Sequence, residues 1–487
     1  MATKLERIFI NRTFKIQFPQ AILTKFVVIF LLSLIIGILV VNKVSILLFI
    51  LFLFPLYFLI LRKPYYGIIG LLVCFTIYNI LPSILPQIFK IVPAGLGTMD
   101  VVLLIFTPPI LIKFFVLASL KKTSFKLNTV DKLALIFIMF AFFAFLGSDN
   151  KMIAAGGFKQ QIRVFLIYLL VRISHPKIQE SKKLLKAIIA IGLIVASYGV
   201  YQYFFDPASY AIHAKATDHL WITMVKGEPS YRIYSLLLSP LGAGNVAMAT
   251  IIILSSMYPI FKKYKWLNFV LVGITSLCLL FTYTRSAWMG CLAGLIVVGL
   301  FRKRHIFKIA FLLILVMISS LFVTKTITFL RHGEGIFFTA GLHYHTFIES
   351  FNYLLQHPLS FGLGEASFSV FEFREPIIWT ENWFFYVWAE LSIFGAILFV
   401  TVLVIFAKIC IRLLRQPDDN FSKNITLATL ACLVGYAVSG SFGMMWGDWV
   451  NSAFFGIMMG IVSTISEKKL MPLFPIRMRE NSQSTSP

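Results

Sequence analysis

Long apolar stretches recur along this chain and constrain its fold more than any other feature. An α-helix needs about 20 apolar residues to cross the hydrocarbon core of a membrane. Three of the stretches are close to that length: residues 26–41, 267–281 and 386–407. Charged residues make up 13% of the sequence, whereas a soluble domain carries about 25%. The pattern therefore predicts an all-α, polytopic integral membrane protein and excludes a soluble globular fold.

We expect about 12 to 14 transmembrane helices, since several of the apolar stretches are short or irregular. They are predicted near residues 22–41, 46–61, 66–83, 101–119, 133–147, 158–173, 185–204, 241–261, 267–284, 286–301, 309–323, 383–407, 425–441 and 452–466. Pro55 and the pair Pro108-Pro109 fall within spans, where proline bends a helix unless neighbouring groups bond to the freed carbonyls. No small-residue cleavage site follows Val41, so we interpret the first stretch as a retained span and not as a signal peptide.

The charged residues follow a side-dependent pattern. Lys and Arg concentrate in the connectors that would be cytoplasmic if the N-terminus were inside, and Asp and Glu concentrate on the other side. The positive-inside rule then predicts that both termini are cytoplasmic. Because the net charge of +24 is spread over these connectors, it does not predict nucleic-acid binding. The five cysteines each lie alone in an apolar run, which predicts packing and neither a metal site nor a disulfide.

Two segments on the predicted outer side are too long to be turns, and they divide the chain into parts. The expected parts are N-terminal transmembrane helices (1–204), an outer loop (205–240), central transmembrane helices that carry Arg285 (241–323), a large extracytoplasmic loop (324–382), C-terminal transmembrane helices (383–466) and a cytoplasmic tail (467–487). The large loop is the longest stretch that could stand outside a membrane. If the chain carries out chemistry, we expect it there.

Histidines and an apolar helical pattern mark the large loop. His343 and His345 either accept protons and bind phosphate or are merely solvated, and the sequence leaves both interpretations open. No acidic or sulfur ligand follows them at a familiar spacing, so we expect no metal. Residues 343–357 predict an amphipathic helix at the membrane surface. Its apolar face would consist of Phe347, Phe351, Leu354 and Leu355.

Arginines stand where a positive charge is costly. Arg285 lies at the turn between two apolar stretches, which predicts either a functional charge or an anchor whose guanidinium reaches the membrane surface. Arg232 precedes another span, and anchoring and ligand binding explain it equally well. Arg163 is explained more simply as an anchor.

Two glutamates accompany the apolar stretch that begins near residue 383. Glu381 either complements the positive end of the helix dipole or acts as a general base whose pKa burial would raise. Glu390 lies about two and a half turns deeper in the same predicted helix. A buried carboxylate needs a partner, and an arginine is the natural choice.

Four segments resemble motifs of a known superfamily, in matching order. They are RIYSLLLSPLGAGNVAMA (232–249), FTYTRSAWMG (281–290) with its Thr-Arg pair, LLQHPLSFGLGEASF (354–368) and ENWFFYVWAELSIFG (381–395). Over roughly residues 230–400 the chain resembles the superfamily of O-antigen ligases and Wzy-type O-antigen polymerases. The resemblance implies a multi-span, C-type glycosyltransferase that takes glycan from a polyprenyl-diphosphate carrier and needs no metal, cofactor or nucleotide sugar.

The resemblance also implies roles for particular side chains. Arg285, Arg232 and Arg331 would bind the diphosphate. Glu381 and His343 would be catalytic, with Glu381 taking the hydroxyl proton of the acceptor. Glu390 and His345 would support them.

Two departures from the superfamily pattern bear on which activity to expect. Ligases have histidine where Glu381 stands, and the arginine at the head of the large-loop helix is replaced by Gly341-Leu342-His343. The departures favour a bacterial cell-surface polysaccharide polymerase, such as one for capsule or teichuronic acid. An O-antigen ligase and a transporter or flippase of lipid-linked glycan are the alternatives.

The polymerase hypothesis also fixes a location and partners. The chain would lie in the bacterial cytoplasmic membrane with its active site on the outer face. Its expected partners are the polyprenyl-diphosphate-linked donor, the glycan acceptor, the lipid bilayer, and a chain-length regulator or flippase.

Overall fold

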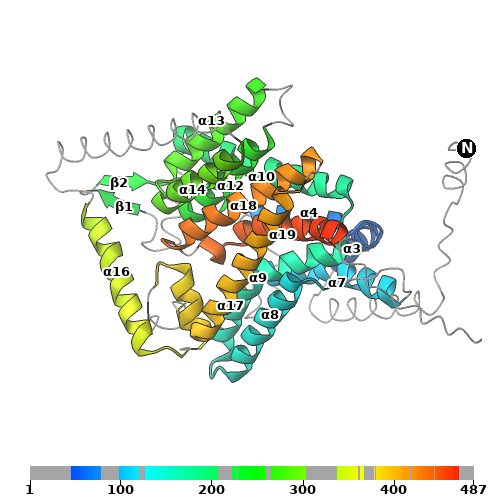
Figure 1. Cartoon of the computed structure of the whole chain (residues 1–487), viewed down its shortest axis with the longest axis horizontal. Coiled ribbons are helices and arrows are strands. Elements are labelled where there is room, and N and C mark those ends of the chain that lie inside the picture. The colour runs from blue at the N-terminus through cyan, green and yellow to red at the C-terminus, as the bar shows by residue number, and fades with distance from the viewer. Residues whose placement is uncertain are drawn as a thin grey trace, which may run out of the picture.

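The protein folds into a bundle of helices (Figure 1). The computed structural model describes residues 45–77, 98–119, 127–206, 222–225, 228–237, 239–258, 265–302, 337–359, 362–366, 378, 380–416, 419–443 and 445–470. Among these residues, 7 helices are long and apolar enough to cross a membrane, so the fold is that of a helical membrane protein with several spans. They are α8 (Thr129–Gly147), α10 (Ile178–Phe205), α12 (Pro240–Met257), α14 (Arg285–Arg302), α17 (Trp383–Leu414), α18 (Asn420–Gly440) and α19 (Trp449–Leu470).

Further helices complete the described bundle. They are α3 (Ser45–Arg62), α4 (Tyr65–Ile77), α7 (Thr98–Ser119), α9 (Lys151–Ser174), α13 (Lys265–Phe281) and α16 (Phe337–Gln356). The predicted spans near 22–41 and 309–323 lie outside the described residues, and each of the others coincides with a helix where it is described. Helix α9 begins earlier than predicted, because the side chain of Asn150 caps it by accepting hydrogen bonds from Met152 and Ile153.

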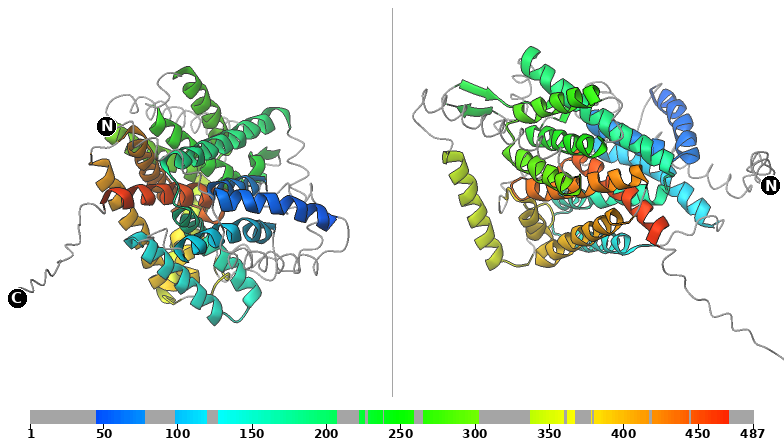
Figure 2. Two further views of the ribbon diagram at one scale, coloured as in Figure 1. Left: turned by 90° about the vertical axis from the view of Figure 1, so that its right-hand side faces the viewer. Right: turned by 45° about the horizontal axis from the view of Figure 1, so that its top comes forward.

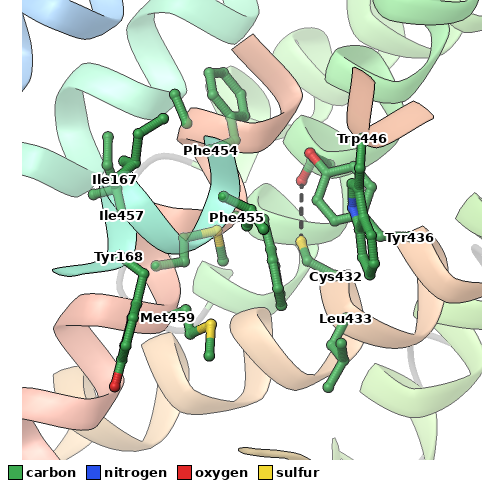
Figure 3. Packing of buried hydrophobic residues seen from close by; sticks show 14 of the residues in the cluster. Ile167, Tyr168, Cys432, Leu433, Tyr436, Trp446, Phe454, Phe455, Ile457 and Met459 are labelled. Carbon is green, nitrogen blue, oxygen red and sulfur yellow. Dashed lines mark hydrogen bonds between the residues drawn. The ribbon is translucent and has the colours of Figure 1, made fainter. Parts of the chain in front are cut away.

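Helices α12 and α19 form the centre of the bundle. The apolar window of α12 is 94% buried and that of α19 is 100% buried. Helix α12 packs against α10, α13, α14 and α18, and α19 packs against α9, α18 and α4. Figure 3 shows Tyr168 of α9, Tyr436 of α18 and Phe455 of α19 in this core. All five cysteines are free, and all but the half-buried Cys74 are buried, as predicted for packing residues.

Glycines allow the central helices to approach closely. A Cβ atom on Gly290 of α14 would lie 2.5 Å from the carbonyl oxygen of Gly435 on α18. A Cβ atom on Gly456 of α19 would lie 2.8 Å from the carbonyl oxygen of Val164 on α9. Small residues at such positions bring helix backbones together, which is the main source of packing energy between helices in lipid.

A buried ionic cluster joins three helices. The guanidinium of Arg172 on α9 forms a 2.8 Å ion pair with Asp131 of α8 and a 2.9 Å pair with Glu467 of α19. The hydroxyl of Tyr168 also donates to Asp131. Because Arg172 and Asp131 are both fully buried, each depends on the other to offset the cost of losing water.

A short hairpin lies within the predicted outer loop 205–240. Strands β1 (Ile222–Val225) and β2 (Glu228–Tyr231) pair antiparallel, with Ile222 opposite Tyr231. A 3₁₀ turn, Ser235–Leu237, follows. The side-chain oxygen of Gln202 on α10 accepts hydrogen bonds from the backbone N–H groups of Tyr234 and Ser235, so this part of the loop is fixed to the bundle.

Helix α17 is broken near its first third, which the apolar sequence did not predict. Leu391 (φ −120°, ψ 15°) and Ser392 (φ 65°, ψ 171°) leave the helical conformation. Helix α16 lies at the edge of the bundle and contacts α17 (Figure 2). The break in α17 and helix α16 therefore lie in the same region of the molecule.

Candidate functional site

Two arginines that are far apart in sequence lie side by side. Arg232 follows the β-hairpin, and its Nε donates to the carbonyl of Thr282 at 3.0 Å while its Nη2 donates to the hydroxyl of Thr284 at 3.2 Å. Both threonines belong to the turn between α13 and α14, and Arg285 is the first residue of α14. The turn is tight because Tyr283 takes a positive φ of 49°. The structure therefore brings Arg232 and Arg285, two of the predicted diphosphate-binding residues, near each other.

The two guanidiniums oppose each other electrostatically. Burial lowers the pKa of Arg232 to about 10, and the positive charge of Arg285 adds to the decrease. Arg232 is still protonated near neutral pH, so the pair holds two positive charges. Arg285 itself is exposed. An anion between them would be attracted by both charges and would remove their repulsion.

The ends of two helices add to this positive field. The hydroxyl of Thr284 donates to the carbonyl of Pro240, the first residue of α12, at 3.0 Å. The first turns of α12 and α14 therefore lie beside the arginine pair. Helix N-termini carry partial positive charge and free N–H groups, which favour anions.

The connector between α18 and α19 (residues 441–448) joins the arginine pair to the start of α17. A Cβ atom on Gly443 would lie 3.1 Å from Leu241 and 3.5 Å from the hydroxyl of Ser286. The connector also contacts the start of α17, because the side-chain nitrogen of Asn382 donates to the carbonyl of Ser441 at 3.0 Å. Asn382 is next in sequence to Glu381, so both groups of candidate residues lie on one end of the bundle.

Glu381 is half-buried and lies just outside α17. Asn382 caps that helix, because its side-chain oxygen accepts from the N–H groups of Phe384 and Phe385 at 2.8 and 3.2 Å. Glu381 precedes this cap, so its charge can complement the helix dipole or act as a base, and both interpretations stay open. Its carboxylate is thus placed near the helix end without being the cap.

Glu390 is fully buried immediately before the break in α17. The side-chain nitrogen of Gln161 on α9 donates to its carboxylate at 3.1 Å. The backbone N–H groups of Gly364 and Ala366 also donate to it. The sequence suggested an arginine as its partner, and the structure corrects this by giving it an amide and backbone donors. These neutral donors can stabilise a buried carboxylate.

The amphipathic helix is present as α16, and part of its apolar face packs on protein. The rings of Phe347 and Phe351 lie 4.9 and 5.7 Å from that of Phe385 on α17. Leu354 is fully buried, whereas Leu355 is exposed. The predicted face is therefore divided between a contact with α17 and an open surface.

The remaining predicted site residues are less well placed or lie outside the described part. His345 is exposed and lies 3.6 Å from Glu349, a neighbour on the same helix. The backbone of His343 lies in α16, but its side chain is outside what the structure describes, as is Arg331 altogether. Among the described residues, no group of three His, Cys, Asp or Glu side chains could hold a metal.

Sequence reasoning missed Asp448, an acid beside the first turn of α12, and it took Arg163 for a membrane-surface anchor. Asp448 accepts from the N–H groups of Val450 and Asn451 at 2.9 and 3.0 Å, and its carboxylate lies 3.0 Å from the Cβ position of Gly242 in α12. Burial raises its pKa, and Arg163 acts against this shift. Arg163 lies 3.8 Å over the ring of Trp449 and donates to the carbonyl of Gly447. It therefore ties α9 to α19, where the sequence suggested a membrane-surface anchor.

The site thus consists of a paired positive charge at the starts of α12 and α14, linked by the 441–448 connector to a half-buried carboxylate at the start of α17. Such an arrangement can bind a polyanion on one side and accept a proton on the other. The sequence of this chain matches no protein-family model and no curated protein.

Proposed function

We propose that this protein is a membrane glycosyltransferase that transfers glycan from a polyprenyl-diphosphate carrier to a carrier-linked acceptor, and so acts as a cell-surface polysaccharide polymerase. The observation that carries the proposal is the Arg232–Arg285 pair. Two neighbouring positive charges attract a polyanion and stabilise negative charge that develops on it. A lipid-linked diphosphate has the charge and shape for that place.

In the proposed reaction the arginine pair stabilises the leaving group. The acceptor hydroxyl oxygen forms a bond to the anomeric carbon, and the bond from that carbon to the diphosphate oxygen breaks. The electron pair leaves with the diphosphate, where the two guanidiniums and the N-termini of α12 and α14 bind the increasing negative charge. Glu381 takes the hydroxyl proton, and the anomeric carbon is inverted.

The resemblance in four ordered segments supports the same proposal, because three of them contribute Arg232, Arg285 and Glu381. His343 and Arg331 remain proposed participants, as catalytic and diphosphate-binding residues. An O-antigen ligase would use the same donor chemistry with a different acceptor. Ligase activity is therefore an alternative that differs from polymerase activity in the acceptor.

Transport of a lipid-linked glycan is the second candidate, and the break in α17 is the observation that favours it. Transporters place substrate and ion sites on discontinuous helices near the middle of the membrane, and Glu390 lies at such a discontinuity. The arginine pair, however, lies at helix ends and not at a mid-helix position. This placement favours chemistry on a headgroup at the surface.

The test is the glycan profile of a strain that lacks this protein and carries wild type, Arg285→Ala or Glu381→Gln at equal membrane levels. Arg415→Ala is the matched control, because Arg415 is an exposed arginine at the other end of α17. A polymerase predicts single repeats on the carrier in both site variants and long polymer in the control.

Other profiles would reject the proposal in distinct ways. Long polymer left on the carrier would indicate a ligase. Repeats held on the cytoplasmic leaflet would indicate a transporter. Wild-type polymer in both site variants would exclude Arg285 and Glu381 from the site.

A further inference from the structure

The break in α17 is filled by a segment from the predicted outer loop. The carbonyl of Pro358 accepts a hydrogen bond from the backbone N–H of Ile393 at 3.2 Å, and another from the indole Nε1 of Trp388 at 3.2 Å. These two donors stand on either side of Leu391 and Ser392. Non-helical backbone within a membrane protein is tolerated where protein groups bond to it, and Pro358 supplies such a group.

The same segment reaches Glu390 a few residues later. The N–H groups of Gly364 and Ala366 donate to the carboxylate, which Gln161 of α9 holds from the other side. Gly364 takes a φ of +87°, and a Cβ atom there would lie 2.2 Å from the carbonyl oxygen of Ile153. Only glycine fits this position, because both the backbone conformation and the space exclude a side chain.

The close approach extends to α9. A Cβ atom on Gly157 would lie 2.2 Å from the backbone nitrogen of Gly364 and 2.9 Å from the carboxylate of Glu390. The segment therefore lies between α9 and α17 with backbone against backbone. Glu390 is the ionisable group at the centre of that contact.

These contacts join several elements into one unit. Helix α16 packs on Phe385, and residues 357–359, which follow α16 directly, contact the first part of α17 through Pro358. The first part of α17 begins next to Glu381, which Asn382 ties to the connector beside the arginine pair. A shift of the segment would therefore move Glu381 relative to Arg285.

We propose that Glu390 is a positioning residue: it clamps residues 362–366 against α17, next to the break that Pro358 fills, and thereby fixes the distance between Glu381 and the arginine pair. The clamp is a property of the fold, and only its effect on turnover rests on the proposed glycosyl transfer. The carboxylate itself touches no reacting atom. It acts through the backbone of Gly364 and Ala366.

The experiment is hydrogen–deuterium exchange with mass spectrometry on the full-length protein in lipid nanodiscs. Glu390→Ala removes the acceptor of two backbone N–H groups, so amides in 357–366 should exchange roughly tenfold faster or more. Gly364→Ala should do the same without touching Glu390. Glu390→Gln keeps one acceptor oxygen and should restore most of the protection.

Gln202→Ala is the matched control, because Gln202 also accepts from two backbone N–H groups of a predicted outer loop. It should speed exchange at 233–237 and leave 357–366 unchanged. Unchanged exchange at 357–366 in both Glu390→Ala and Gly364→Ala would overturn the clamp. The clamp would also be overturned if Glu390→Ala exchanged faster across the whole bundle while Gly364→Ala kept the wild-type pattern. That result would show general destabilisation by the loss of Glu390.

Turnover separates the clamp from the proposed function. With a lipid-diphosphate donor, Glu390→Ala should lower kcat and leave the donor KM near wild type, and Glu390→Gln should recover kcat. A raised donor KM with unchanged kcat would overturn the positioning role. If the wild type transfers no glycan, the proposed function fails, and the exchange result alone decides the clamp.

Discussion

Arg232 lies so close to Arg285 that the charge of the second lowers the pKa of the first, although 53 positions separate them in the sequence. The contact depends on the turn between α13 and α14, whose Thr282 and Thr284 both accept from Arg232. Shifted pKa values of this kind are common at functional sites, where a bound ligand can relieve the repulsion between like charges.

Removing one charge of the pair should stabilise the empty protein. Arg285→Gln ends the repulsion, so the midpoint of thermal unfolding should rise by about 1–2 °C. Inorganic pyrophosphate should stabilise the wild type, by roughly 2–3 kcal/mol at 100 times its Kd, and should not stabilise the variant. Thermal unfolding in detergent with and without pyrophosphate measures both effects. A lower midpoint in the variant would contradict the repulsion.

Anion binding at the pair should weaken in alkaline solution. Arg232 loses its proton as the pH rises through about 10, so sulfate, whose charge is constant there, should bind less well. The folded pKa lies below that of an unfolded arginine, so the unfolded chain binds more protons above pH 10. Stability relative to Arg232→Gln should therefore rise with pH from about 10. Sulfate titrations between pH 8 and 11 test the first point, and a wild-type curve parallel to that of Arg232→Gln would refute it.

Close packing of α14 on α18 should make Gly290→Ala destabilising. The new Cβ atom would meet the carbonyl oxygen of Gly435 at 2.5 Å, and separating the two helices should cost about 1–3 kcal/mol. Gly273→Ala on α13 is the control, since nothing lies within 4 Å of its Cβ position. That variant should be neutral or stabilised by up to about 1 kcal/mol, because alanine favours helix. Equal unfolding midpoints for the two variants would show that the close approach is absent.

The buried ionic cluster should respond unequally to single and double substitution. Arg172→Met leaves Asp131 buried without its guanidinium and should cost about 3–5 kcal/mol. Adding Asp131→Leu removes the orphaned charge and should recover part of that loss. Unfolding free energies of the two single variants and the double variant form the cycle. Additive losses would mean that the two charges do not interact.

Much of the fold can be predicted from hydropathy because each helix in lipid must bond its own backbone. The starts of α12 and α14 lie within two residues of the predicted spans near 241–261 and 286–301. The two arginines can also be picked out from the sequence, because Arg285 is the first residue of α14 and Arg232 precedes the start of α12 by eight residues. Their mutual distance cannot, since it depends on how the hairpin and the α13–α14 turn pack.

The features that escaped prediction all depend on contacts between distant segments. Ser392 is neither glycine nor proline, and nothing near it in the sequence predicts a break. The break is stabilised by the carbonyl of Pro358, which accepts from the N–H of Ile393, 35 positions away. An arginine was expected as the partner of Glu390, because an opposite charge is the simplest way to offset the cost of burying a carboxylate. Neutral donors from distant segments, among them Gln161, Gly364 and Ala366, offset the burial instead, and no local pattern predicts them.

The hydrogen bond from Ile393 to Pro358 has a consequence for the order of folding. In an unbroken helix the N–H of Ile393 would bond to the carbonyl of Ala389, four residues earlier. The residues around the break are compatible with that state, so α17 can enter the membrane as a continuous helix with every N–H satisfied. The exchange of that partner for Pro358 requires Pro358 to lie against α17, a position that only the assembled helices provide. The broken form of α17 is thus a product of assembly and not of insertion.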